Sequence, residues 1–231
     1  MAEQPALTGD AVYGRRPVAE ARQGRRRVRR VWTRDELPAH ELSRLAGSPD
    51  HQGVVADVDP YPYADAAELL ATPDAVIVAL DEVTDPQNLG AVARTAEASG
   101  ATGVVIPERR AAEVTPAAAK ASAGAVEHLP VARVRNLADW LGQAKERDAW
   151  VYGAAGGPGA VSYDEPDYRG RVVLVLGSEG RGLRPRVASA CDQLVALPQL
   201  GRVGSLNVST AAAALVYGIL QFRSLGVDRG P

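Results

Sequence analysis

The stretch Ala75-Val-Ile-Val-Ala-Leu80 is a short continuous run of apolar residues, three of them β-branched. Such a run is typical of a strand that is buried on both faces of a parallel sheet. After it, Leu89, Val92, Ala93 and Ala96 recur at helical spacing. A buried strand followed by an amphipathic helix is the repeating unit of an α/β domain, so this stretch sets the expected fold class.

The same alternation continues toward the C-terminus. Further strands are predicted at 103–106, 127–131, 150–152, 172–176 and 194–197, and helices at 115–122, 137–147 and 208–220. We therefore expect an α/β domain with a mainly parallel sheet over residues 75–231. The pattern alone favours an unknotted, Rossmann-like sheet, because knotted chains are rare.

The residues before this domain follow a looser pattern. Residues 1–58 contain few apolar residues, and short strands near Val12 and at 28–32 and 51–58 predict a small α+β domain. Asp59-Pro-Tyr-Pro-Tyr-Ala-Asp65 has the prolines and tyrosines of a stiff connector, so residues 59–74 are predicted to be a linker.

The composition is that of an ordinary globular protein, with 46% hydrophobic and 23% charged residues. No apolar run reaches the roughly 20 residues that span a bilayer, and the start resembles neither a secretory signal nor a lipidation motif. The single Cys191 is expected to be a small buried residue, and the three histidines have no metal-ligand spacing. These features predict a cytoplasmic protein without a membrane anchor or a metal.

Charge is distributed unevenly along the chain. The net charge is −2, yet residues 1–34 contain nine arginines against Glu3, Asp10 and Glu20. A basic segment on an acidic body is typical of a protein that binds a polyanion such as nucleic acid. Arginine outnumbers lysine along the whole chain, so the many arginines of residues 1–34 could also belong to a solvated basic tail that binds nothing.

Three turns that follow predicted strands carry polar and glycine residues: 81–94, 177–183 and 198–209. In a parallel sheet such turns meet at the carboxyl edge, where ligands bind. In the last of them, Gly201 and Gly204 allow close backbone approach, while Ser205 and Asn207 stand where a helix begins. The sequence therefore predicts a site for a small polar molecule.

The glycine pattern excludes several common enzyme classes. The glycines of 177–182 have the order GxxGxG, which differs from the GxGxxG of dinucleotide-binding proteins, and no GxxxxGK[ST] phosphate loop is present. Neither Ser178 nor Ser205 lies in the GxSxG turn of a serine hydrolase. The enzyme class that these exclusions leave is one that transfers a group between two reactants by holding them in position.

Three segments resemble the signature motifs of the SpoU (TrmH) family of RNA ribose 2'-O-methyltransferases. They are Asp85-Pro-Gln-Asn-Leu-Gly-Ala-Val-Ala-Arg-Thr-Ala96, Leu176-Gly-Ser-Glu-Gly-Arg-Gly-Leu183 and 197–211, in the family's order and spacing. Gly14-Arg-Arg-Pro-Val-Ala-Glu-Ala21 and His51-Gln-Gly-Val-Val-Ala56 are similar to the substrate-binding domain of the branch that methylates a guanosine of bacterial 23S ribosomal RNA. In this chain, the interval 22–51 is shorter than in that branch.

The resemblance implies a SPOUT-like fold with a deep C-terminal trefoil knot. It implies that the threaded chain binds S-adenosylmethionine through groups around Gly177, Leu197 and Leu206. It also implies a homodimer whose active site uses both chains, although burial within one subunit explains the apolar last helix equally well.

The resemblance also implies a set of catalytic residues. These are Asn88, Arg94, Glu179, Ser205 and Asn207. Three of them, the two asparagines and the serine, could instead cap the helices that follow them. In the family, the arginine activates the ribose hydroxyl, but a guanidinium stays protonated, so positioning a phosphate or lowering the hydroxyl pKa is an equal alternative. The glutamate is expected to orient Arg94 or Asn88.

The expected RNA contacts are basic residues of the first domain and of the last loop: Arg15, Arg16, Arg25, Arg26 and Arg202. The leading prediction is a 2'-O-methyltransferase of 23S ribosomal RNA. A transfer RNA ribose methyltransferase and a non-catalytic RNA-binding assembly factor are the alternatives.

Overall fold

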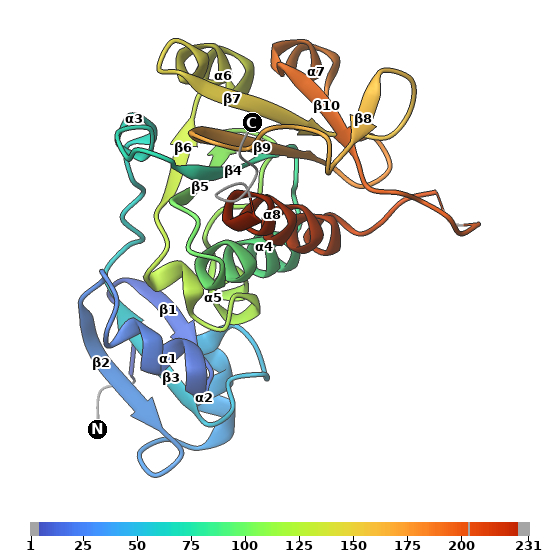
Figure 1. Cartoon of the computed structure of the whole chain (residues 1–231). Coiled ribbons are helices and arrows are strands. Elements are labelled where there is room, and N and C mark those ends of the chain that lie inside the picture. The colour runs from blue at the N-terminus through green and yellow to red at the C-terminus, as the bar shows by residue number, and fades with distance from the viewer. Residues whose placement is uncertain (1–4, 203, 226–231) are drawn as a thin grey trace.

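The computed structural model describes residues 5–202 and 204–225 of the chain. They form two sheets, a three-stranded sheet of order β1-β3-β2 and a seven-stranded sheet of order β6-β5-β4-β9-β7-β10-β8. Figure 1 shows the small sheet at the N-terminal end of the molecule and the large sheet beyond it, with α4 and α5 between the two.

The small sheet contains β1 (Asp10–Tyr13), β2 (Val28–Thr33) and β3 (Val54–Val58), with β1 and β2 both antiparallel to β3. Two helices cover it, α1 (Arg15–Ala21) and α2 (Ala39–Ala46). Successive side chains of a strand point to opposite faces, so Val12 packs with Val18 of α1 while Tyr13 packs with Leu42 of α2. This unit has an apolar cluster on each face.

The large sheet is parallel between each pair of neighbouring strands that the structure describes. Its members are β4 (Val76–Asp81), β5 (Gly103–Pro107), β6 (Val131–Val134), β7 (Ala149–Ala154), β8 (Ala160–Ser162), β9 (Arg171–Gly177) and β10 (Gln193–Ala196). Every residue of β4 is buried. The prediction of an α/β fold with a mainly parallel sheet is therefore confirmed.

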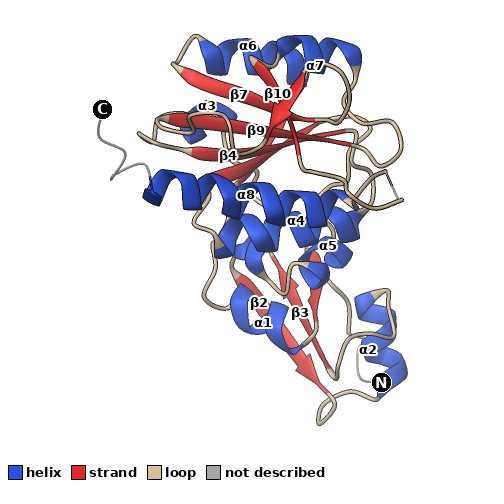
Figure 2. Cartoon of the chain, turned by 45° about the vertical axis from the view of Figure 1, so that its right-hand side comes forward, coloured by secondary structure: helices blue, strands red, loops and turns tan. Residues whose placement is uncertain are grey.

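Helices cover both faces of the large sheet, as Figure 2 shows. On one face lie α4 (Pro86–Ala98), α5 (Pro116–Ala121) and α8 (Val208–Leu225), which pack on Val76, Val78 and Leu80 of β4. On the other lie α3 (Ala66–Leu69), α6 (Leu137–Lys145) and α7 (Pro185–Ala190), which pack on Ile77 and Ala79. In the described parts of the chain, none of the helices has the length and apolar character needed to cross a membrane.

One predicted strand was wrong. Residues 125–127 form a 3-10 helix, η1 (Ala125–Glu127), and the strand expected at 127–131 is β6, which begins only at Val131. Gly124 has a φ of 93°, which turns the chain before η1, and Glu127 is buried rather than part of a ladder. The short elements α3, α7 and β8 were not predicted, because segments of three to six residues show no periodicity.

Two further expectations concerned Cys191 and the predicted linker at residues 59–74. Cys191 is half-buried, its Sγ donates to the Val187 carbonyl, and burial raises the pKa of its thiol to about 12. Residues 59–74 are extended up to Asp65 and then form α3, whose Ala66 and Leu69 pack on the large sheet.

Candidate active site

A cavity of about 250 Å³ opens at the carboxyl ends of β7, β9 and β10. Because these strands are parallel, their ends meet at one edge of the sheet. Leu197, Gln199, residues 204–206 and the first turns of α8 complete the wall. The lining is mostly backbone and small or apolar side chains, with polar groups from Ser178, Glu179, Gln199 and Ser205. This composition suits a small molecule that combines a flat ring with a few polar atoms.

The three residues predicted to bind the cofactor, Gly177, Leu197 and Leu206, all line this cavity. Gly177 has no room for a side chain, since an added Cβ would lie 2.2 Å from the carbonyl carbon of Gly182. The chain returns so closely because the Gly182 N–H donates to the Ser178 carbonyl at 2.9 Å. A side chain at Gly177 would therefore displace the turn that forms one wall.

Three side chains from distant parts of the sequence meet beside this cavity. The Asn88 Nδ2 donates to Glu179 Oε1 at 3.0 Å, and the Asn207 Nδ2 donates to Asn88 Oδ1 at 3.0 Å and to Glu179 Oε1 at 2.5 Å. We call this set the amide–carboxylate cluster. It joins the start of α4, the turn after β9 and the start of α8.

The way in which α4 and α8 are capped leaves the amide nitrogens of Asn88 and Asn207 available to the cluster. The N-cap of α4 is Asp85, which accepts from the Gln87 N–H at 2.9 Å, so Asn88 is not needed as a cap. Asn207 does cap α8, since its Oδ1 accepts from the Ser209 N–H at 2.8 Å while its Nδ2 points to the cluster. Ser205 lines the cavity instead of capping the helix.

The cluster also borders a second, more polar cavity of about 620 Å³. Asn88 and Glu179 line it together with charged residues that follow β4 and β5, among them Glu82 and Arg110. Glu179 lines both cavities. A group bound in one would thus lie next to a group bound in the other.

Two predicted residues lie outside this arrangement. Arg94 is exposed on α4 and lines neither cavity, and Glu179 bonds to Asn88 and Asn207 rather than to Arg94. Arg202 is exposed in the loop before α8 and also lines neither cavity. A single subunit therefore brings together four of the five expected catalytic residues.

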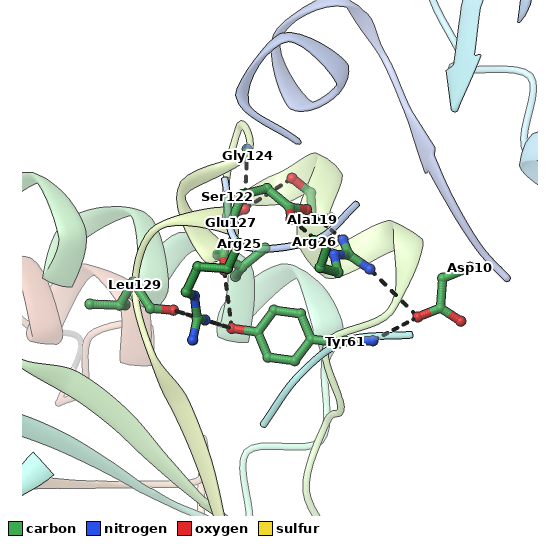
Figure 3. A network of polar contacts seen from close by, with 10 residues as sticks. Asp10, Arg25, Arg26, Tyr61, Ala119, Ser122, Gly124, Glu127 and Leu129 are labelled. Carbon is green, nitrogen blue, oxygen red and sulfur yellow. Dashed lines mark hydrogen bonds and ion pairs between the residues drawn. The ribbon is translucent and has the colours of Figure 1, made fainter. Parts of the chain in front are cut away.

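Arg26, expected to contact RNA, is instead buried between the small sheet and the large domain (Figure 3). Its Nε donates to Glu127 Oε2 at 2.9 Å, and its Nη1 lies 3.5 Å from Asp10 Oδ2. Glu127 has 1% of its surface exposed, and a buried carboxylate needs a paired cation. Arg26 is therefore paired within the protein, and local sequence did not indicate this because its partner lies 101 residues away.

Arg25 is engaged in the same network. Its Nη2 donates to the Tyr61 hydroxyl at 2.8 Å and to the Leu129 carbonyl at 3.0 Å. Burial raises the pKa of Tyr61 to about 12, although the charge of Arg25 acts in the opposite direction. The guanidinium of Arg25 is thus used within the protein, whereas Arg15 and Arg16 are exposed at the start of α1.

The sequence reasoning missed the charged wall of the second cavity. Glu82 and Arg110 form an ion pair of 3.3 Å, and both have positive φ values, 55° and 58°. Both residues come within three positions of the end of a buried strand, and this position at the carboxyl edge was the available signal. Among residues 5–202 and 204–225, no three His, Cys, Asp or Glu side chains are grouped so that they could hold a metal ion.

Comparison with known proteins gives a consistent result. Residues 75–217 match the model of the SpoU rRNA Methylase family. An uncharacterized tRNA/rRNA methyltransferase of Synechocystis is 37% identical over 98% of this chain and 66% of its own length. The protein YacO of Bacillus subtilis, named as a TrmH family tRNA/rRNA methyltransferase, is 37% identical over 93% of this chain and 96% of its own length.

Solved structures are similar over nearly the whole chain. The SpoU methyltransferase AviRb of Streptomyces viridochromogenes superposes with a TM-score of 0.79, at 28% identity, over 94% of this chain and 90% of its own. The same protein in complex with AdoMet gives a TM-score of 0.77 at 26% identity, over 93% of this chain and 90% of its own. The similarity includes the small N-terminal sheet as well as the large domain.

Proposed function

The chain belongs to the SpoU rRNA methylase family, and from this we propose that it transfers a methyl group from S-adenosylmethionine to a ribose 2'-hydroxyl of RNA. One observation carries the proposal. The amide–carboxylate cluster lies between a small cavity of apolar and backbone groups and a larger polar one. This arrangement suits two different reactants that must meet at a fixed distance.

The first cavity fits the cofactor. Leu197 and Leu206 offer apolar contacts to an adenine, and Gly177 lines the same cavity with its backbone groups. When bound there, S-adenosylmethionine supplies a methyl group on a sulfonium, which is already a good leaving group. A C-terminal knot, as the resemblance to the family implies, would hold this wall in place, and we include the knot in the proposal.

The protein must then position the ribose and accommodate the hydroxyl proton. Asn88, Asn207 and Glu179 hold one another in a single arrangement, and Ser205 lines the adjoining cavity. Ordered donors and acceptors of this kind fix the direction of an incoming hydroxyl. Because a guanidinium is a poor base, we assign Arg94 the role of holding a phosphate or lowering the hydroxyl pKa.

Arg94 lies outside the cluster of its own subunit, which supports a homodimer in which it serves the partner's site. Helix α8 presents an exposed stripe that includes Tyr217, which is 50% exposed. An aromatic side chain at this exposure on an otherwise apolar helix suits a contact with a second subunit. Residues 1–58, joined through 59–74, would present Arg15 and Arg16 to RNA.

The substrate proposed is a guanosine of 23S ribosomal RNA, which would place the enzyme in the cytoplasm. The test is incubation of the purified protein with labelled S-adenosylmethionine and either 23S ribosomal RNA or transfer RNA, followed by mass spectrometry of the nucleosides. We expect 2'-O-methylguanosine from the ribosomal RNA. Label only in transfer RNA would support the alternative substrate, and RNA binding without any incorporation would support the assembly factor.

The shared site is tested by complementation. Arg94→Ala and Asn207→Ala should each abolish methyl transfer while changing cofactor affinity only severalfold. When the two variants are co-expressed, mixed dimers contain one site with both residues intact, and activity should return. Full activity of Arg94→Ala alone would refute its assignment, and no recovery in mixed dimers would refute the shared site.

A further inference from the structure

A third cavity at the carboxyl edge of the large sheet has an unusual lining. It measures about 300 Å³, and the residues that line it include five arginines, Arg109, Arg110, Arg135, Arg184 and Arg186, and no acidic residue. They come from the segments that follow β5 and β6 and from the start of α7. We call it the arginine cavity.

We propose that the arginine cavity binds backbone phosphates of the RNA strand beside the methylated nucleotide. The inference rests on the proposed function and adds a binding site to it. A guanidinium offers several N–H donors in a plane that matches the oxygens of a phosphate. Five of them around one cavity present this chemistry from several directions.

Two of the five arginines carry charge that the protein does not neutralise. Arg184 pairs with the buried Asp81 at 2.6 Å, Arg110 with Glu82 at 3.3 Å and Arg186 with Asp139 at 2.6 Å. Arg109 and Arg135 form no ion pair or side-chain hydrogen bond within the described ranges, 5–202 and 204–225. Their charges remain available to an anion.

A helix end adds to the positive potential. Leu137 and Ala138 are the first two residues of α6 and line the cavity, and N–H groups at such positions have no acceptor within the helix. The Asn136 side chain accepts only from the next N–H, that of Asp139, at 3.4 Å. The positive end of a nine-residue helix therefore points at the same space as the guanidinium groups.

The position of the cavity favours an RNA strand over a small anion. Arg110 lines both the arginine cavity and the polar cavity that contains Asn88 and Glu179, so the two cavities adjoin at this residue. The side chains of Arg110 and Arg186 are 78% and 70% exposed. An open basic path that leads away from a reaction site suits a polyanion whose neighbouring phosphates extend beyond the reacting nucleotide.

The decisive variant is Arg109→Ala/Arg135→Ala, which removes the two unpaired charges. Binding to a labelled 23S ribosomal RNA transcript should weaken at least about tenfold. The plot of log K against log salt should become shallower by about 1.4, because two contacts to single-stranded RNA are lost. The KM for RNA should rise while kcat at saturating RNA changes little, and S-adenosylmethionine affinity, measured by calorimetry, should be unchanged.

The matched control is Arg147→Ala/Arg169→Ala. These exposed arginines each precede a strand of the same sheet by two residues, β7 and β9, and therefore lie at its amino edge. This control should keep the RNA affinity and salt dependence of the wild type. Arg109→Lys/Arg135→Lys keeps both charges and should retain the wild-type salt slope.

Three results would overturn the inference. One is an unchanged affinity and salt slope in Arg109→Ala/Arg135→Ala, and another is an equal loss in the amino-edge control. The third is saturable binding of inorganic phosphate that this variant abolishes without any effect on RNA, which would indicate a site for free phosphate. If the wild-type protein neither binds nor methylates RNA, the proposed function fails instead.

Discussion

At the scale of single residues, Glu179 connects the two halves of the candidate site. Its Oε1 accepts hydrogen bonds from both Asn88 and Asn207, which lie 119 residues apart. Asn207 in turn uses its oxygen to cap α8 and its nitrogen to bind the cluster. The Asn207 side chain thus stabilises the start of α8 and also helps to position the other members of the cluster.

We predict that Glu179→Ala lowers kcat about 100-fold, because both amides lose the acceptor that orients them. Glu179→Gln keeps an oxygen acceptor and should retain more activity. The measurement is methyl transfer at saturating RNA and cofactor, with Glu97→Ala, an exposed acid at the other end of α4, as the control. Wild-type kcat in Glu179→Ala would contradict the positioning role.

At the scale of elements, α4 owes its position to a close helix contact. Gly90 faces α5 so closely that an added Cβ would lie 2.5 Å from the Ala118 carbonyl oxygen and 2.6 Å from the Ala121 Cβ. Only glycine allows the two helices to approach this far. Since Asn88 lies two residues before Gly90, this contact also sets where the site amide stands.

Gly90→Ala should therefore destabilise the protein by about 1–3 kcal/mol, because the gain in helix propensity is outweighed by overpacking. Gly142→Ala is the matched control, since an added Cβ on α6 meets nothing within 4 Å. That change should stabilise the fold by about 0.5–1 kcal/mol. Urea unfolding monitored by circular dichroism measures both, and an equal effect of the two changes would contradict the packing argument.

At the scale of the whole molecule, the two sheets are joined by a buried ion pair. Arg26 and Glu127 have side-chain exposures of 4% and 0%, and Asp10 and Tyr61 complete the network between the two parts. Removal of one partner leaves the other charge buried without compensation. The attachment of the N-terminal unit is thus specified by a contact between distant residues.

Arg26→Ala should reduce the free energy of unfolding by about 3 kcal/mol, because Glu127 stays buried and unpaired. Replacing both residues, as in Arg26→Met/Glu127→Leu, should restore much of the loss. Arg44→Ala, which breaks a partly exposed pair with Glu41 and a hydrogen bond to the Pro5 carbonyl, should cost only about 1 kcal/mol. Wild-type stability of Arg26→Ala together with weaker RNA binding would contradict this structural role and would support a contact of Arg26 with RNA.

The same interface predicts how stability depends on alkaline pH. Burial raises the pKa of Tyr61 from 10 to about 12, so above pH 10 the unfolded chain loses this proton while the folded protein keeps it. The stability linked to Tyr61 is complete below pH 10 and is lost as the pH rises toward 12. Urea unfolding across this range should show Tyr61→Phe with a shallower pH dependence, and identical slopes would contradict the shift.

Much of the architecture could be predicted from local pattern. The buried run at 75–80, the helix after it and the three polar turns all follow from hydrophobic period and strand ends, which are properties of neighbouring residues. The membership of the amide–carboxylate cluster came from motif resemblance, and its hydrogen bonds came only from the structure. Short elements such as α7 left no periodic signal.

The sequence by itself determined the alternation of strands and helices and the glycine-rich turns, and it nominated the candidate site residues through motif resemblance. Only the tertiary structure decided which arginine side chains have an acidic partner within the described chain and which do not. Arg26 lies in an arginine-rich run that predicted a contact with RNA, yet it pairs with the buried Glu127, whereas Arg109 and Arg135 have no such partner in the described chain. Burial and pairing depend on residues about a hundred positions away, and no local pattern contains them.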